Sequence, residues 1–274
     1  MTRTAIVTGA SSGIGASAAA SLSEAGWQVG VIGRDPVRTH AIARAIGGTP
    51  FLADFDRLDD VRELAAAIAD RYDHIDVLAN NAGGLQHKRT ASADGHEKTI
   101  QHNHLAPFLL TRLLLPVLTR SRARVIGTAS VANTFAPLHL DDLDFARRPW
   151  LGGWRAYGAS KLATILFARE LAIRTELDPY SFHPGYVSTG FGTDAAIVRL
   201  GNALSGGGFG LSPAQGAAPL VHLATVDTID APRGTYFDGL RPNGRVHASA
   251  AIDGISAALW HESSRLVGLP SEIS

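Results

Sequence analysis

Short runs of apolar residues alternate along this chain with longer segments in which apolar side chains recur at helical spacing. A short run bounded by Gly, Pro, Asn or Ser predicts a buried strand, and helical spacing predicts a helix packed by one face. The predicted strands are 4–7, 27–33, 51–53, 75–79, 124–130, 180–182 and 234–237. The predicted helices are 16–25, one beginning at 36, 59–72, 96–118, one following 153, one beginning at 213, and 255–266. This alternation predicts an α/β fold, in which a single domain over 1–274 forms a doubly wound parallel sheet flanked by helices on both faces.

Two prolines interrupt the pattern. Pro107 falls inside the predicted helix 96–118. It predicts a kink there, because proline has no N–H for the helical ladder. Pro179 falls directly before the run 180–182, in a short connecting segment, and predicts a stunted strand.

Composition narrows the class of protein. The chain has 274 residues, of which 45% are hydrophobic and 18% charged, as expected for a soluble globular enzyme. Its formal net charge is zero, so we expect no nucleic-acid partner. It has no Cys, which excludes disulfides, thiol catalysis and thiolate metal sites. The strand pattern begins at once, and Gly and Pro break the uncharged stretch 200–226, so we expect no signal peptide, no membrane span and a cytoplasmic location.

The turn after the first predicted strand reads Thr-Gly-Ala-Ser-Ser-Gly-Ile-Gly over positions 8–15 and leads into a helix. A glycine-rich turn between a strand and a helix lets the backbone approach a pyrophosphate, and the helix N-terminus offers free N–H groups. An ordinary glycine-rich turn is the alternative. The strand and helix on either side favour a dinucleotide site.

The end of the second predicted strand bears on the choice of cofactor. A carboxylate at that position favours NAD, whereas an Arg accommodates the 2′-phosphate of NADP. Here Gly33 takes the strand end and Arg34 follows. Asp35 precedes Pro36 and is interpreted as a helix N-cap, although it could still reach a ribose hydroxyl. NADP(H) is therefore preferred, and NAD(H) stays open.

Polar residues also end two later strands. Asn80 and Asn81 follow the run 75–79, and Ser130 ends the run 124–130. Ligands bind outside the carboxyl ends of parallel strands, so we expect these side chains on the same edge as the glycine-rich turn.

A loop from 131 to 153 holds Asp141, Asp142 and Asp144. Three carboxylates can form a metal site, but no spaced His accompanies them. We interpret them as part of a solvated loop and predict no metal.

Tyr157 and Lys161 lie four residues apart, on one face of a predicted helix. A free phenol is a poor acid or base at neutral pH, and an ammonium one turn away lowers its pKa. The pair therefore predicts a general acid/base. A half-buried Tyr beside a solvated Lys is the alternative.

Taken in order, these motifs resemble the short-chain dehydrogenase/reductase family, and the resemblance covers nearly the whole chain. More narrowly, the chain is similar to the branch that includes retinol dehydrogenases and protochlorophyllide reductases. Asn103-His104-Leu105, Ser160-Lys161-Leu162-Ala163 and His183-Pro184-Gly185 support this, as does the long interval between Ser130 and Tyr157.

The resemblance implies a Rossmann-like fold and a role for each matching residue. Tyr157 would be the acid/base, Ser130 would bind the substrate oxygen, Lys161 would hold the nicotinamide ribose, and Asn103 would support a water relay to Lys161. The implied cofactor-binding residues are Gly9, Ser11, Ser12, Gly13, Ile14, Gly15, Arg34, Asp54, Phe55, Asn81, Ala82, Gly83, Tyr157, Lys161, Pro184, Gly185, Val187 and Thr189. NADP-preferring relatives often carry a basic residue where Ser12 stands, so this position weakens the preference for NADP.

The function implied is an NADP-dependent carbonyl reductase or alcohol dehydrogenase. A non-redox lyase or isomerase and a nucleotide-sensing binding protein on the same fold are the alternatives. A substrate loop is expected at about 186–211. The candidate pocket residues are largely apolar and predict a lipophilic or aromatic substrate, although they could equally be loop core: Leu138, Trp154, Tyr186, Phe191 and Phe209. Whether the protein forms a homo-oligomer stays open.

Overall fold

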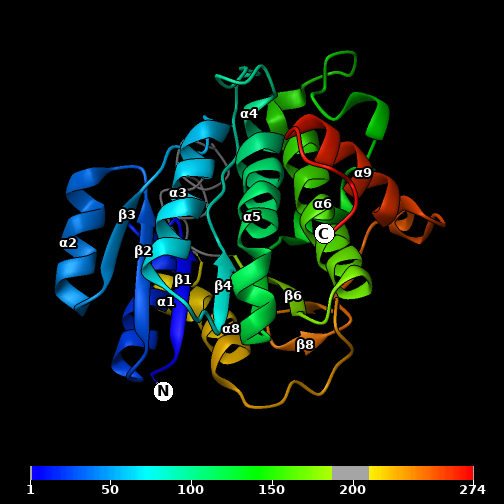
Figure 1. Cartoon of the computed structure of the whole chain (residues 1–274). Helices are drawn as coiled ribbons and strands as arrows, with labels where there is room; N and C mark the ends of the chain where they lie inside the picture. The colour runs from blue at the N-terminus through cyan, green and yellow to red at the C-terminus, as the bar shows by residue number, and fades with distance from the viewer. Residues whose placement is uncertain (1, 187–209, 274) are drawn as a thin grey trace.

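The computed structural model describes residues 2–186 and 210–273, and within them one sheet runs through the molecule (Figure 1). Its order is β3-β2-β1-β4-β5-β6-β7-β8. Neighbouring strands are parallel except β8, which pairs antiparallel with β7. The strands are β1 Thr4–Thr8, β2 Gln28–Gly33, β3 Thr49–Leu52, β4 Val77–Asn80, β5 Arg124–Thr128, β6 Asp178–His183, β7 Tyr236–Asp238 and β8 Arg241–Pro242. The predicted fold class is confirmed, with β8 as an additional edge strand.

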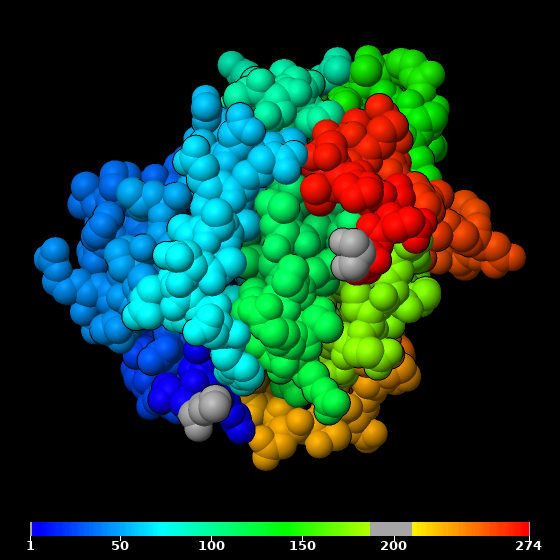
Figure 2. All heavy atoms as spheres, viewed as in Figure 1, coloured from blue at the N-terminus to red at the C-terminus, as the bar shows by residue number. Residues whose placement is uncertain are grey.

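Helices cover both faces of the sheet. The longer helices are α1 Gly13–Glu24, α2 Pro36–Ile46, α3 Leu58–Arg71, α5 Ala106–Ser121, α6 Trp154–Arg174, α8 Pro213–Thr225 and α9 Ile255–Leu266. Successive residues of β1 show the two cores: Ile6 packs with side chains of α3 and α5, and Val7 packs with those of α1 and α8. A strand buried on both faces reads as a continuous apolar run, as this one does. Figure 2 shows α3, α5 and the C-terminal segment side by side over one of these faces.

The strand order reverses between β1 and β4, because β1 connects away to β2 on one side and β4 lies on the other. In open parallel sheets this switch point leaves a crevice at the carboxyl ends, where ligands bind. The glycine-rich turn after β1 and the Asn pair at the end of β4 both lie there.

The predicted helix 96–118 is interrupted, as Pro107 suggested, but by a wider turn. α4 Lys98–Ile100 leads into a π turn, η1 Gln101–Leu105, and α5 begins at Ala106 with Pro107 in its first turn. The N–H of Ala106 donates to the carbonyl of Gln101, five residues back. Pro107 has no N–H to give to the carbonyl of Asn103, its α-helical partner. The π turn contains His102, which lines the crevice, and Asn103, which lies behind it.

The expectation of a stunted sixth strand is wrong. β6 is six residues long and pairs with both β5 and β7. Asp178 donates to Ala123 beside β5, so Pro179 presents its nitrogen to the other side, where β7 has not yet begun. Proline is tolerated in a strand where no partner needs its N–H.

The loop 131–153 contains three short 3-10 turns: η2 Val131–Thr134, η3 Leu140–Asp142 and η4 Leu151–Gly153. Asp142 is buried, and it accepts hydrogen bonds from the N–H of Ala146 (2.7 Å) and from Arg148 (2.7 Å). The interpretation of this carboxylate as solvated is therefore wrong: it braces the loop. Among the described residues, no helix is long and apolar enough to cross a membrane.

Candidate active site

A pocket of about 890 Å³ lies along the carboxyl ends of β1 to β6. Most of the predicted site residues line it: Gly9, Ser11, Ser12, Gly13, Ile14, Gly15, Arg34, Asp54, Phe55, Asn81, Ala82, Gly83, Ser130, Tyr157, Lys161, Pro184 and Gly185. Asn103 lies behind the pocket wall, and Val187 and Thr189 fall outside the described residues. One elongated pocket thus joins the glycine-rich turn to Tyr157.

The glycine-rich turn is shaped by two requirements. Gly13 opens α1 with a φ of 56°, in the left-handed region that favours glycine. A Cβ on Gly15 would lie 2.4 Å from the carbonyl oxygen of Gly9 and 2.6 Å from Nδ2 of Asn81. The residue before α1, Ser12, makes no side-chain cap, so the first N–H groups of the helix face the pocket without that partner. Such a terminus suits a pyrophosphate.

Asn81 ties the three central strands together at this edge. Its Nδ2 donates to the carbonyl of Thr8 (3.0 Å), and its Oδ1 accepts from the hydroxyl of Thr128 (3.3 Å). The Thr8 hydroxyl in turn accepts from the N–H groups of Asn81 (2.9 Å) and Ala82 (2.8 Å). Thr8 and Thr128 carry no signal of this role in the sequence, because the contact joins strands far apart in the chain.

Several charged side chains line the end of the pocket beside β2 and α2. Asp35 caps α2: its carboxylate accepts from the N–H of Arg38 (2.9 Å) and pairs with the Arg38 guanidinium (3.1 Å). The backbone hydrogen bond from Arg38 is the largest cause of the lowered pKa of Asp35. Arg34 is two-thirds exposed, and its Nη1 lies 3.7 Å from Oδ1 of Asp54. Asp35 is therefore the N-cap of α2, as interpreted from the sequence. The exposed Arg34 is available to a ligand at this end of the pocket.

A network of polar side chains borders this end. Ligand atoms of Asp54, Asp56 and His102 lie within 4.8 Å of one another. Asp56 already accepts hydrogen bonds from Lys98 and from His102 (2.8 Å). The cation of Lys98 occupies one carboxylate oxygen, so the arrangement is that of an ion-pair network. His102, which sequence reasoning missed, lines the pocket directly before Asn103.

Tyr157 and Lys161 are both buried on α6, with Nζ of Lys161 5.6 Å from the centre of the tyrosine ring. The ammonium donates to the carbonyl of Thr128 (2.7 Å), and burial lowers the pKa of Lys161 to about 8. Burial raises the pKa of Tyr157 to about 12, and a hydrogen bond with Ser130 opposes that shift. The expectation that Lys161 would lower this pKa below its ordinary value is not met, because desolvation of the phenol dominates.

Asn103 connects the loop after β4 to helix α6. Its Oδ1 accepts from the N–H of Gly84 (2.8 Å), and its Nδ2 donates to the carbonyl of Gly84 (3.0 Å) and to the hydroxyl of Ser160 (2.8 Å). Ser160 in turn donates to the carbonyl of Tyr157 (2.8 Å). A Cβ on Gly83 would lie 2.5 Å from Oδ1 of Asn103 and 3.4 Å from Nζ of Lys161. Asn103 therefore lies next to the pair, and its part in a water relay stays a prediction.

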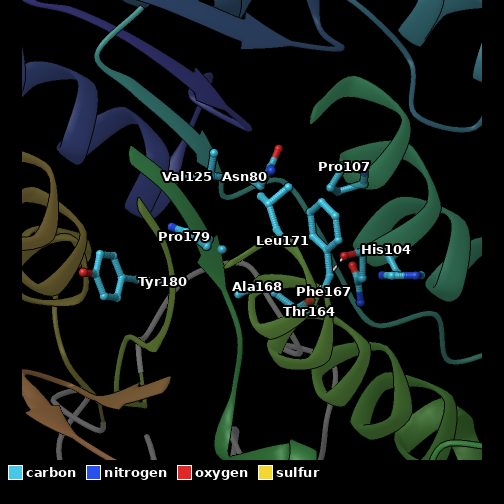
Figure 3. Close-up of a pocket in the computed structure, with 12 residues that line it drawn as sticks. Asn80, His104, Pro107, Val125, Thr164, Phe167, Ala168, Leu171, Pro179 and Tyr180 are labelled. Carbon is cyan, nitrogen blue, oxygen red and sulfur yellow. Dashed lines mark hydrogen bonds between the residues drawn. The ribbon is translucent and has the colours of Figure 1, made fainter. Parts of the chain in front are cut away.

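A second cavity, of only about 20 Å³, lies behind Asn103 between the sheet and helices α5 and α6 (Figure 3). Its lining includes Asn80, whose Oδ1 is buried and has no hydrogen-bond partner within the described part of the chain. This volume admits about one water molecule. It is too small for a substrate, whereas the larger pocket is not.

Aromatic side chains line the end of the large pocket beside Tyr157. Trp154, Tyr186 and the unpredicted Phe135 line it, and Phe135 is 65% exposed. Leu138, a predicted pocket residue, is instead buried in the core beneath the loop. Phe191 and Phe209 lie outside the described residues. The two ends of the predicted substrate loop meet where the N–H of Leu211 donates to the carbonyl of Tyr186 (2.7 Å).

Comparison with known proteins agrees with this geometry. Residues 3–141 match the family described as short chain dehydrogenase. The chain is 42% identical over 275 residues to "Putative daunorubicin C-13 ketoreductase DnrU" of Streptomyces sp. (strain C5), covering 97% of this chain and 93% of the relative. It is 34% identical to retinol dehydrogenase 13 of Homo sapiens, and the match covers 97% of this chain and 85% of the relative.

Among solved structures, an uncharacterized protein from Mycobacterium paratuberculosis superposes with a TM-score of 0.79 at 32% identity, covering 99% of this chain and 95% of that one. The chain belongs to the short-chain dehydrogenase/reductase family. It is an NAD(P)-dependent oxidoreductase of that family, similar to DnrU and to the retinol dehydrogenases.

Proposed function

We propose that this enzyme is an NADP-dependent carbonyl reductase or alcohol dehydrogenase acting on a lipophilic or aromatic small molecule. The observation that carries the proposal is the hydrogen bond between Ser130 and Tyr157 at the aromatic end of the cofactor pocket, with Lys161 beneath the ring. A carbonyl oxygen placed between the two hydroxyl groups would accept a hydrogen bond from Ser130 and a proton from Tyr157.

The residues fit the cofactor as well as the substrate. The turn around Gly13 would hold the pyrophosphate, and Arg34 would meet the 2′-phosphate. The bound nicotinamide supplies or accepts the hydride. Lys161, turned toward Thr128 at the pocket floor, would hold the nicotinamide ribose and keep positive charge near Tyr157. Tyr157 would deliver the proton in reduction and remove it in oxidation.

The aromatic lining supports the substrate class. Phe135, Trp154 and Tyr186 present apolar surface beside Tyr157, and Trp154 packs edge-on against Tyr157 with ring centres 6.1 Å apart. Such a wall suits a flat apolar substrate. The names of two relatives mention daunorubicin and retinol.

The test is a panel of lipophilic ketones and aldehydes, assayed with NADPH by the loss of its absorbance. We expect turnover with aromatic or polycyclic ketones that is absent in Tyr157→Phe and without substrate. Small polar aldehydes serve as the comparison. Conversion of a substrate without consumption of NADPH would favour a lyase or isomerase, and cofactor binding with no turnover across the panel would favour a nucleotide sensor.

A further inference from the structure

One buried amide holds the turn that carries Ser130. Asn133 lies in η2, the 3-10 turn that begins directly after Ser130, and it is fully buried. Its Nδ2 donates to the carbonyl of Ser130 (2.9 Å), and its backbone N–H donates to the same oxygen (3.0 Å). Two donors of a single residue therefore hold the backbone of the serine.

The same amide reaches a distant part of the chain. Its Nδ2 also donates to the carbonyl of Arg245 (3.2 Å), and its Oδ1 accepts from the N–H of His247 (3.2 Å). Both polar atoms of the amide thereby have hydrogen-bond partners. A fully satisfied buried polar group rigidifies its surroundings. The turn after Ser130 is thus fixed to the segment that follows β8.

Asn133 also contacts the surroundings of the catalytic tyrosine. Tyr236, at the start of β7, is buried and packs with Ala129 and Ile165. Burial raises the pKa of Tyr236, Asp238 and Tyr157 raise it further, and a hydrogen bond with Asn133 lowers it. Asn133 therefore interacts both with Tyr236, which interacts electrostatically with Tyr157, and with Ser130, which hydrogen-bonds Tyr157.

We infer that Asn133 is a positioning residue for the reaction: it fixes the Ser130 backbone so that the serine hydroxyl stays within reach of both Tyr157 and the substrate oxygen. This inference rests on the proposed function, in which Ser130 and Tyr157 have their roles. Displacing a catalytic group by about 1 Å can cost up to about 10²-fold in rate. No motif of the sequence pointed to Asn133, because its partners at 245 and 247 are more than a hundred residues away.

The test compares Asn133→Ala and Asn133→Asp with wild type and with the matched control Thr134→Ala. Thr134 is on the same turn, and its hydroxyl donates to the carbonyl of Val131 (2.9 Å), within the turn itself. Asn133→Asp keeps the shape and the acceptor for His247 but removes both donors. We expect turnover to fall about tenfold in both Asn133 variants while the affinity for NADPH is unchanged. Thr134→Ala should behave as wild type.

The pH profile of alcohol oxidation separates positioning from a merely structural role. Among the described residues, the polar groups near the Tyr157 ring include the Ser130 hydroxyl, the Lys161 ammonium and the hydroxyl of Tyr236. If Ser130 drifts, the hydrogen bond that lowers the pKa of Tyr157 is lost, so the profile should move to higher pH in both variants. A shift in Asn133→Asp alone would show an effect of its charge and would overturn the inference.

A readout without catalysis keeps the inference separate from the proposed function. In protein with labelled tyrosine rings, the resonance of the ring carbon that bears the Tyr157 hydroxyl reports hydrogen bonding to that hydroxyl, and Tyr157→Phe assigns it. We expect the chemical shift of this resonance to change in Asn133→Ala and to stay the same in Thr134→Ala, whichever substrate the enzyme uses. An unmoved resonance together with wild-type turnover would refute the role of Asn133, whereas an inactive wild type with a moved resonance would count against the proposed substrate class alone. If Asn133→Ala does not fold, Asn133→Asp decides: turnover within about twofold of wild type would overturn the inference.

Discussion

The ammonium of Lys161 donates a 2.7 Å hydrogen bond to the backbone carbonyl of Thr128, at the carboxyl end of β5. This contact fixes a buried cation at the floor of the pocket, one helical turn from Tyr157. Burial lowers the pKa of Lys161 to about 8, so its charge changes within the range in which such an enzyme is assayed.

Lys161→Met should weaken cofactor binding and lower turnover. In wild type, cofactor affinity should fall as the pH rises through about 8, because the neutral amine makes weaker hydrogen bonds than the ammonium. The variant should bind weakly at every pH, with no inflection near that value. Titration of NADPH fluorescence across the pH range measures this, and Lys88→Met, an exposed lysine, is the control. A variant with the wild-type profile would make Lys161 an ordinary buried residue.

Tyr157→Phe should abolish most of the activity while leaving the fold intact. The change removes one hydroxyl and little volume, and general acid/base groups contribute roughly 10²–10⁴-fold in rate. Burial raises the pKa of Tyr157 to about 12, so the phenol is protonated at neutral pH and ready to donate. Reduction should therefore be favoured at neutral pH, and oxidation should accelerate as the pH rises. Steady-state rates of reduction and oxidation test this prediction, and thermal melting checks that the variant is folded. Activity of the variant within about threefold of wild type would show that Tyr157 is not the acid/base.

Asn103 and Ser160 should act as one unit. Asn103→Ala removes the clamp between the loop after β4 and helix α6, and Ser160→Ala removes one end of it. Residues in one hydrogen-bond network show coupling of about 0.5–3 kcal/mol in double-mutant cycles. We expect each single variant to lose thermal stability and turnover, and the double variant to lose less than the sum. Strict additivity would show that the two side chains stabilise the site independently.

Gly15→Ala should prevent cofactor binding. The new Cβ would lie 2.4 Å from the Gly9 carbonyl oxygen and 2.6 Å from Nδ2 of Asn81, so helix α1 must move away from the glycine-rich turn. Gly26→Ala is the matched control, since no atom of the described residues, apart from its chain neighbours, lies within 4 Å of its Cβ position. The control should lose a little stability, because its φ is 83°, and keep normal binding. Calorimetric titration with NADPH compares the two.

The local parts of this site could be predicted, and the non-local parts could not. The turn around Gly13 is defined by residues that are neighbours in the chain, so strand, turn and helix could be recognised together. The acceptor of Lys161 is a backbone carbonyl of Thr128, and a carbonyl has no sequence signal. Leu138 is apolar and lies in a loop without periodicity, so its sequence could not show whether it faces the pocket or the core. Its place in the core follows from how the loop folds over α6.

The reason for Gly33 is also non-local, and it bears on the choice of cofactor. A Cβ at this position would lie 2.3 Å from Oγ1 of Thr39 and 2.8 Å from Cβ of Ser11. Gly33 is therefore required by packing between the end of β2, α2 and the glycine-rich turn. A carboxylate at Gly33 would disturb the fold as well as the preference for NADPH over NADH. This preference must therefore be tested at Arg34.

Wild type should prefer NADPH over NADH by about 10–100-fold in kcat/KM, since a hydrogen bond to a charged group contributes about 1.5–3 kcal/mol and about 1.4 kcal/mol corresponds to tenfold. The lower half of that range is expected, because Ser12 takes the place of a second basic residue and Arg34 already lies 3.7 Å from Asp54. Arg34→Ala should bring the ratio close to one, mainly by weakening the binding of NADPH. Arg38→Ala should change it less, because the Arg38 guanidinium is paired with Asp35 at 3.1 Å. A wild-type ratio below one, restored towards NADPH by Asp35→Asn, would show that Asp35 binds the ribose hydroxyls despite its role as the cap of α2.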